Sequence, residues 1–144
     1  MRKIFFHFAD KKARIDNSTR IKDFISKLFQ NEKVDFIRID YIFCSDEYLL
    51  QMNTKFLQHS YYTDIISFSL NEINTPVIGE IYISLDRVKE NAKKYNVLFQ
   101  EEILNVIIHG ALHLCGYKDK TKKEVGLMRF IEKKYLHSFK KLNT

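Results

Sequence analysis

Residues 100–116, QEEILNVIIHGALHLCG, predict the helix that organises the rest of the chain. Apolar residues occupy nearly every side of this stretch, which is typical of a buried helix. Gly116 follows the last apolar residues and supplies the usual stop signal. The sequence on either side alternates between strand and helix patterns and contains no internal repeat.

Strand patterns occur mainly before this helix, at Arg2–Phe8, Val34–Phe43, Ile65–Leu70 and Ile78–Leu85. In Val34–Phe43, apolar residues alternate with Arg38 and Asp40, which is the period-two pattern of a strand with one buried face. The residues predicted for that face are Ile37, Ile39, Tyr41 and Phe43. Asn71, Asn74 and Pro76 predict a turn between the last two strands.

Helical periodicity marks the remaining segments. Asn17 or Ser18 can cap a helix whose apolar stripe is Ile21, Phe24, Ile25, Leu28 and Phe29. Ser45, with two acidic residues after it, opens a second helix, and a third carries Val88, Ala92 and Tyr95. Thr121 and Glu124 form a capping-box pair before a last helix striped by Val125, Met128, Ile131, Tyr135 and Phe139.

This order of elements predicts an α+β fold, with a small mixed β-sheet of about four strands packed with about five helices. A length of 144 residues fits one domain, residues 1–144, against a prior of roughly 150 residues per domain. No apolar run approaches the 18 residues of a membrane span. The N-terminus lacks the apolar stretch of a signal peptide, and two cysteines are too few for a disulfide framework. We therefore expect a cytoplasmic protein with no membrane partner.

The charge of the chain is concentrated in one segment. Residues 118–141 contain nine Lys or Arg and three Asp or Glu, which accounts for the whole net charge of +6. Such a segment could bind a polyanion such as RNA. A solvated helix in a lysine-rich protein explains the same pattern equally well.

Candidate metal ligands lie in the buried helix and just after it. His109 and His113 are four residues apart, so both imidazoles project from one helix face about one turn apart. Gly116 then lets the chain turn back and bring Asp119 to the same ion. Two imidazoles and one carboxylate leave a coordination position open for water, as in catalytic zinc sites. Bound zinc lowers the pKa of that water to about 7, which creates a nucleophile at neutral pH.

Three alternatives arise at this motif. A histidine pair at this spacing also occurs by chance, but in an apolar helix an unpaired imidazole is costly, which favours a shared metal ion. Cys115 lies about 200° around the helix from His113 and is expected to pack as a small hydrophobe. Zinc proteases of the H-E-x-x-H type place a glutamate directly after the first histidine, where this chain has Gly110. A zinc protease is therefore disfavoured.

The motif resembles the signature of the YbeY family of ribosomal-RNA maturation factors, H-G-x-L-H-L-x-G-Y-D-H. Three further stretches are similar to family motifs in the same order, and they are Met52-Asn53 with 63–68 (TDIISF), 79–84 (GEIYIS), and Glu124 with Met128. The chain departs from the family pattern in two places. Asp119 stands where the family has its third histidine, after Lys118, and Leu57 stands where it usually has an arginine implicated in RNA handling. His59 is a possible substitute for that arginine, or an ordinary surface residue.

The resemblance implies a metal-dependent endoribonuclease that acts on single-stranded RNA in small-subunit (16S) rRNA 3′-end maturation and ribosome quality control. One divalent ion, expected to be zinc, would be held by His109, His113 and Asp119 and would activate water or the RNA 2′-hydroxyl. No catalytic side chain is assigned beyond the water that this ion would hold. The implied partners are ribosomal RNA and the small ribosomal subunit.

Other residues near these motifs have open roles. Asp64 and Ser67 are candidates to support the site or position substrate, or they hydrogen-bond at a strand end. Glu124 is expected to be a capping residue rather than a general base. Phosphates could be held by Lys118, Lys120, Lys122 and Lys123. Two other functions stay open, namely a ribosome-assembly factor with a structural metal and a metal-dependent hydrolase of another substrate.

Overall fold

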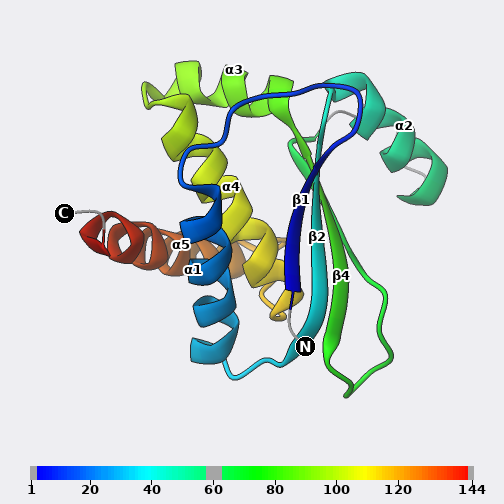
Figure 1. Ribbon diagram of the computed structural model, residues 1–144, viewed down its shortest axis with the longest axis vertical. Coiled ribbons are helices and arrows are strands. Elements are labelled where there is room, and N and C mark those ends of the chain that lie inside the picture. Colours follow the sequence, from blue (N-terminus) through cyan, green and yellow to red (C-terminus); the bar gives the residue numbers. More distant parts are fainter. Residues whose placement is uncertain (1–2, 58–62, 143–144) are drawn as a thin grey trace.

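The computed structural model describes residues 3–57 and 63–142, and the element order in it is the one predicted from the sequence (Figure 1). The elements are β1 (Lys3–Phe8), α1 (Ser18–Asn31), β2 (Phe36–Cys44), α2 (Asp46–Leu57), β3 (Ile65–Ser69), β4 (Val77–Ser84), α3 (Leu85–Tyr95), α4 (Phe99–Leu114) and α5 (Lys122–Leu142). None of the helices in these two ranges is long and apolar enough to cross a membrane.

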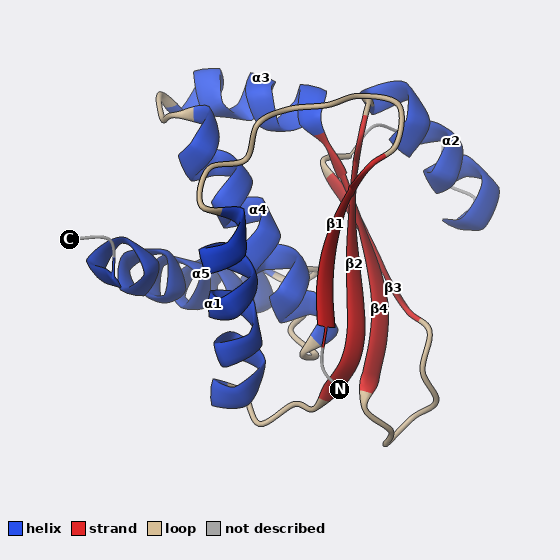
Figure 2. Cartoon of the chain, in the orientation of Figure 1, coloured by secondary structure: helices blue, strands red, loops and turns tan. Residues whose placement is uncertain are grey.

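The four strands form one mixed sheet in the order β1-β2-β4-β3 (Figure 2). β1 and β4 both pair in parallel with β2, while β3 pairs antiparallel with β4. Parallel neighbours need crossover connections, which α1 supplies between β1 and β2. The sheet and its five helices confirm the predicted α+β fold.

Helices cover both faces of the sheet, and α4 lies at the centre of the larger layer. α1, α4 and α5 lie on one side of the sheet, as Figure 2 shows. The main core fills this side and includes Ile25, Tyr41, Ile81 and Ile107, all with no exposed surface. On the opposite face, α2 packs over a smaller cluster made by Cys44, Leu49, Ile66 and Tyr82. The prediction that α4 is buried is therefore confirmed.

Two glycines let α4 approach the sheet closely. A methyl group added at Gly110 would lie 2.8 Å from Ile81 Cγ2 and 2.9 Å from Ile65 Cδ1. One added at Gly79 on β4 would lie 2.8 Å from Leu114 Cδ1. A side chain at position 110 would therefore collide with the sheet, which gives a packing reason for the glycine that stands where the H-E-x-x-H motif has its glutamate.

Two local predictions are wrong. Ile37 is exposed because the register between β2 and β4 shifts between Phe36 and Arg38, which gives the buried position to Phe36. Asn17 precedes α1 in a left-handed conformation with φ of 58°, and its side chain makes no capping bond. Caps usually need an extended backbone.

Most helix starts follow the predicted capping chemistry. Ser45 Oγ accepts the backbone N–H of Tyr48 at the start of α2. Ser84 Oγ accepts that of Arg87, so β4 ends at Ser84 and Leu85 already belongs to α3. Thr121 and Glu124 exchange the two bonds of a capping box, which confirms the structural role expected for Glu124.

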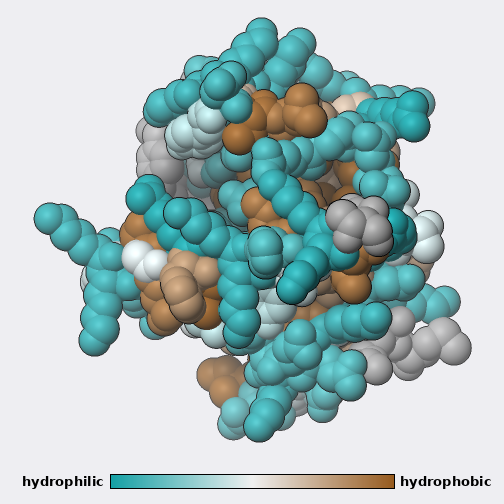
Figure 3. Space-filling model, turned by 90° about the vertical axis from the view of Figure 1, so that its left-hand side faces the viewer, coloured by the Kyte–Doolittle hydropathy of each residue, from teal (hydrophilic) through white to brown (hydrophobic). Residues whose placement is uncertain are grey.

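The surface around the C-terminal helix is largely hydrophilic. Figure 3 views the side from which the C-terminal end of α5 projects, and hydrophilic residues cover most of it with apolar residues between them. The lysines at 140 and 141 lie in the last turn of α5, where cations interact favourably with the helix dipole.

Candidate metal centre and cleft

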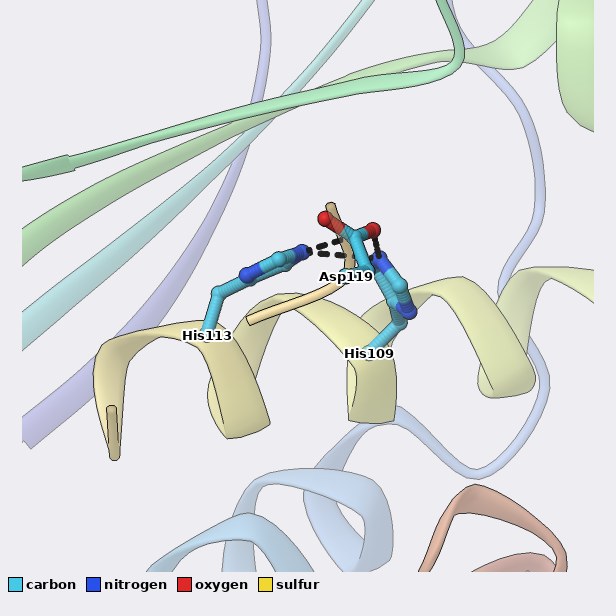
Figure 4. A group of neighbouring side chains, drawn as sticks. All are labelled: His109, His113 and Asp119. Atoms are coloured by element: carbon cyan, nitrogen blue, oxygen red, sulfur yellow. Dashed lines mark hydrogen bonds and ion pairs between the residues drawn. The ribbon is translucent and has the colours of Figure 1, made fainter. Parts of the chain in front are cut away.

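The structure brings His109, His113 and Asp119 together. The two histidines project from one face of α4, and Asp119 returns to them from the loop after the helix (Figure 4). Asp119 Oδ2 lies 3.4 Å from His109 Nε2 and 3.3 Å from His113 Nε2. The two Nε2 atoms are 2.9 Å apart. All three ligand atoms lie within 4.8 Å of one another, close enough for a single ion.

Hydrogen bonds on the far side of each ring fix how the histidines face this point. His113 Nδ1 lies 3.0 Å from the carbonyl oxygen of Tyr117, and a carbonyl only accepts, so Nδ1 carries the proton. His109 Nδ1 lies 3.2 and 3.1 Å from the carboxylate oxygens of Glu132 and donates to them. In both neutral rings Nε2 is then a bare acceptor. Such second contacts typically orient metal-binding histidines.

This arrangement fits a metal ion. Two acceptor nitrogens 2.9 Å apart repel each other unless a proton or a cation lies between them. Ligand atoms about 2.0–2.2 Å from a tetrahedral zinc ion are themselves roughly 3.3 Å apart, which is close to both Asp119 distances. Two imidazoles and a carboxylate are also a ligand set that zinc takes in catalytic sites. The residues therefore suit a divalent ion of this type.

The end of α4 positions His113 directly. Gly116 has φ of 106°, and the N–H groups of Gly116 and Tyr117 bond back to the carbonyls of His113 and Leu112. These two bonds form a Schellman motif, which needs a residue with positive φ at this position. The motif places the Tyr117 carbonyl against His113 Nδ1. The same turn thus ends the helix and sets the imidazole tautomer.

Tyr117 also connects the site to the rest of the helical layer. Its hydroxyl donates to Glu32 Oε1 at 2.7 Å, at the C-terminal end of α1. The hydroxyl of Tyr135 on α5 donates to the other oxygen of Glu32. One carboxylate therefore links α1, α5 and the turn that holds His113.

Carboxylates surround His109. Burial lowers the pKa of His109, but the hydrogen bond to Glu132 and the charges of Glu132, Asp119 and Asp64 outweigh burial and raise it overall. Burial raises the pKa of the Asp64 carboxyl, while His109 opposes that shift. A cation at this centre is therefore favoured by three nearby acidic groups.

The other residues singled out in the sequence have varied positions. Asp64 lines the cleft beside His109. Ser67 does not line it, and lies on β3 opposite Ile81, on the face that packs against α4. Cys115 packs against the core and is not part of the ligand group. Lys118, Lys120, Lys122 and Lys123 are all exposed. The side chain of Leu57 and the whole of His59 lie outside the described residues.

A cleft of about 610 Å³ extends from the metal centre between α3, α4 and α5. Acidic groups line it, namely Asp64, Glu102, Asp119 and Glu132, together with Arg129 and Lys133 of α5. Asn91 and Tyr95 contribute from α3, and Asn105 lies between Glu102 and His109 on α4. The cleft is thus wide enough for a small organic group, with the predicted metal ligands at one end.

Sequence reasoning missed two buried carboxylates in this cleft. Glu132 is 7% exposed and Glu102 is 8% exposed. A signal was present, because Glu132 falls on the apolar stripe of α5, four residues after Met128 and three before Tyr135. Glu102 likewise interrupts an apolar helix. An acid on a buried face usually has a partner or a function.

Comparison with known proteins gives a consistent result. The family model described as "Endoribonuclease YbeY" matches residues 5–140. The chain is 46% identical over 126 residues to Endoribonuclease YbeY of Cytophaga hutchinsonii, covering 88% of each chain. It is 42% identical over 132 residues to the protein of the same name from Christiangramia forsetii, covering 92% of each.

A solved structure has the same fold. The solution structure of TM1509 from Thermotoga maritima superposes with a TM-score of 0.65 at 30% sequence identity. The superposition covers 95% of this chain and 89% of the other. Fold and sequence therefore point to the same group of proteins.

Proposed function

This chain belongs to the Endoribonuclease YbeY family, and from that premise we propose that it is a metal-dependent, single-strand-directed endoribonuclease. In the proposed role it acts in the cytoplasm on the 3′ end of small-subunit (16S) rRNA and in ribosome quality control. The single domain, residues 1–144, holds both the metal centre and the cleft. The proposed cofactor is one divalent metal ion, and zinc is the ion that we propose.

One observation carries this proposal. The Nε2 atoms of His109 and His113 converge with Asp119, while both Nδ1 atoms are occupied by outer hydrogen bonds. A family member with a ribonuclease name and a site of this chemistry is expected to use the ion in the reaction. The departure at position 119 is accommodated because a carboxylate is also a zinc ligand.

The protein groups have distinct tasks in the proposed reaction. His109, His113 and Asp119 hold the ion, which when bound supplies a Lewis acid for the phosphodiester and for the attacking hydroxyl or water. Glu132 and the Tyr117 carbonyl keep the two imidazoles in the ligand tautomer. Arg129 and Lys133 of α5 lie at the cleft and are placed to contact RNA phosphates. Asp64 is a candidate to orient the substrate beside His109.

A matched pair of histidine variants tests the activity. Purified protein is incubated with single-stranded RNA, with and without a chelator, beside His113→Ala and the control His137→Ala, an exposed histidine on α5. We expect cleavage by the wild type and His137→Ala, and none after chelation or with His113→Ala. Elemental analysis should find about one divalent ion per chain in the wild type.

The outcomes separate the candidate functions. RNA binding without cleavage would support an assembly factor with a structural metal, for which the change at position 119 is the favouring observation. Metal without action on RNA would point to a hydrolase of another substrate. The ribosomal role is tested with a small-subunit rRNA precursor carrying its 3′ extension. Cleavage confined to that extension supports the role, whereas uniform cleavage along the precursor contradicts it.

A further inference from the structure

The end of the cleft away from the histidines contains a carboxylate that no described residue pairs with. Glu102 is 8% exposed and lines the cleft from α4. Among residues 3–57 and 63–142, its side chain has no hydrogen bond and no ion pair. No side-chain oxygen in these ranges is both fully buried and without a partner, so the Glu102 carboxylate still reaches the cleft although most of its hydration is lost. A fold that keeps such a carboxylate in a cleft leaves it available to a ligand with donors.

The position of Glu102 relative to the metal centre suits one nucleotide. Glu102, Asn105 and His109 lie at i, i+3 and i+7 on α4 and therefore share one helix face. Two turns of helix separate Glu102 from His109 by about 10 Å. This is comparable to the reach of a nucleotide from its phosphate to the far edge of its base. A phosphate at the histidines would therefore put its base near Glu102.

The α3 and α5 sides of the cleft provide an aromatic ring for a base and cations for its phosphate. Tyr95 is 56% exposed at the end of α3 and lines the cleft, so its ring is available for stacking. Arg129 and Lys133 line the α5 side and have no ion pair within the described part of the chain. Single-stranded bases are commonly held by such stacking and by hydrogen bonds to their Watson–Crick edges.

On the premise of the proposed function, we propose that this end of the cleft is a nucleobase subsite in which Glu102 selects guanine. A carboxylate offers two acceptors side by side. Guanine alone among the four bases presents two adjacent donors on its Watson–Crick edge, N1–H and the N2 amino group. Uracil presents one donor between two carbonyl oxygens, which a carboxylate repels. Charge-assisted bidentate pairs are both strong and directional.

The electrostatics around Glu102 agree with this assignment. Burial and the charges of Asp64, Glu132 and Glu101 raise the pKa of Glu102 to about 7. Arg129 and Lys133 of α5 are cations that line the same cleft, and Asn91 and Tyr95 line it from α3 as uncharged groups. A ligand that donates two hydrogen bonds favours the ionised form. The preference for guanine should therefore grow as the pH rises from 6 to 8.

Nucleotide binding tests the subsite without requiring catalysis. GMP, AMP, CMP and UMP, which contain no phosphodiester to cleave, are titrated into zinc-loaded, isotope-labelled protein at pH 8, and NMR shifts give the dissociation constants. All four share the same phosphate, so differences report the base. We expect GMP to bind about five- to a hundredfold more tightly than UMP, the discrimination of one bidentate pair. Equal binding of the four nucleotides would overturn the proposal.

A matched pair of variants assigns the preference to Glu102. Glu102→Gln keeps the shape but replaces one acceptor with a donor, so the ratio of GMP to UMP affinity should fall to near one. Glu101→Gln removes the same charge one residue away, at a side chain that pairs with Lys140 and does not line the cleft, and should keep the ratio. A ratio that survives in Glu102→Gln would overturn the assignment.

Cleavage assays separate this inference from the proposed function. Four RNA substrates that differ at a single position are compared, with uridine elsewhere. Cleavage next to guanine above the other bases supports the subsite. Cleavage of all four at equal rates leaves the ribonuclease function standing and contradicts the subsite. Selective GMP binding without any cleavage would support the subsite and contradict the enzyme.

Discussion

At the histidine end of the cleft, the outer nitrogen of each ring has a hydrogen-bond partner, whereas at the other end the Glu102 carboxylate has none among the described residues. Both ends lie on the same face of α4. The two ends therefore differ in their hydrogen-bond partners. The histidines are already oriented, whereas the Glu102 carboxylate is available to a ligand.

That difference indicates what each end can hold. Groups with fixed partners cannot adapt, which suits a cation that demands particular ligand atoms and distances. A buried acid without a partner gains a large benefit from any ligand that supplies donors. We therefore assign the fixed end to the metal and the available end to a base. Variants of Glu132 and Glu102 test this division, and variants of Gly110 and Glu124 test the helices that carry it.

Removing the outer partner of His109 should have the largest effect. Glu132→Ala leaves the three ligands intact but frees the His109 ring, so zinc affinity should fall about 10- to 100-fold. Glu132→Gln keeps an acceptor for the His109 ring, so its zinc affinity should fall less. Competition with a chromophoric chelator measures both values. Unchanged affinity in Glu132→Ala would mean that α4 alone fixes the ring, and the contrast between the two ends would disappear.

Gly110 and Gly126 test how closely α4 must lie on the sheet. Gly110→Ala places a methyl group against Ile81 and Ile65 and should lower the free energy of unfolding by about 1–3 kcal/mol. Gly126→Ala on α5 meets no atom within 4 Å and should raise it by about 0.5–1 kcal/mol through helix propensity. Urea unfolding measures both. Stabilisation by Gly110→Ala would show that α4 can move away from the sheet without lowering the free energy of unfolding.

Titration of Glu102 should lower the free energy of unfolding as the pH rises. Its pKa is raised from 4.5 to about 7, so the folded protein binds more protons than the unfolded chain between these values. The free energy of unfolding should therefore fall as the pH rises through this range, by on the order of 1–2 kcal/mol after allowing for solvent screening. Glu102→Gln should remove that part of the slope and be the more stable protein at pH 8. Parallel slopes for both proteins would show that Glu102 has a partner.

Glu124 should have the smallest effect. Glu124→Ala removes half of the capping box of α5 and should lower the free energy of unfolding by about 0.5–1 kcal/mol. RNA cleavage per folded molecule should be unchanged, because the side chain lies outside the cleft. Loss of cleavage at full stability would instead assign a catalytic task to Glu124.

The sequence was sufficient for features that depend on local spacing. The periodicity of apolar residues predicted the element order, and the i, i+4 histidines with Gly116 and Asp119 predicted which groups converge. It was not sufficient where two distant elements meet. The apolar stripes mark Glu132 and Glu102 as acids on buried faces, but the groups they meet depend on how α5 and α3 pack across α4, which no local spacing encodes. The exposure of Ile37 likewise depends on how β2 pairs with β4, since the shift in register there involves both strands.

The contact between Tyr117 and Glu32 has a consequence for how the molecule opens. Local opening of the C-terminal turn of α1 would release Glu32 and, with it, the turn whose carbonyl holds His113. By linkage, an ion bound at the histidines should slow amide hydrogen exchange at the end of α1. The ion would then stabilise a helix that begins more than eighty residues earlier in the chain.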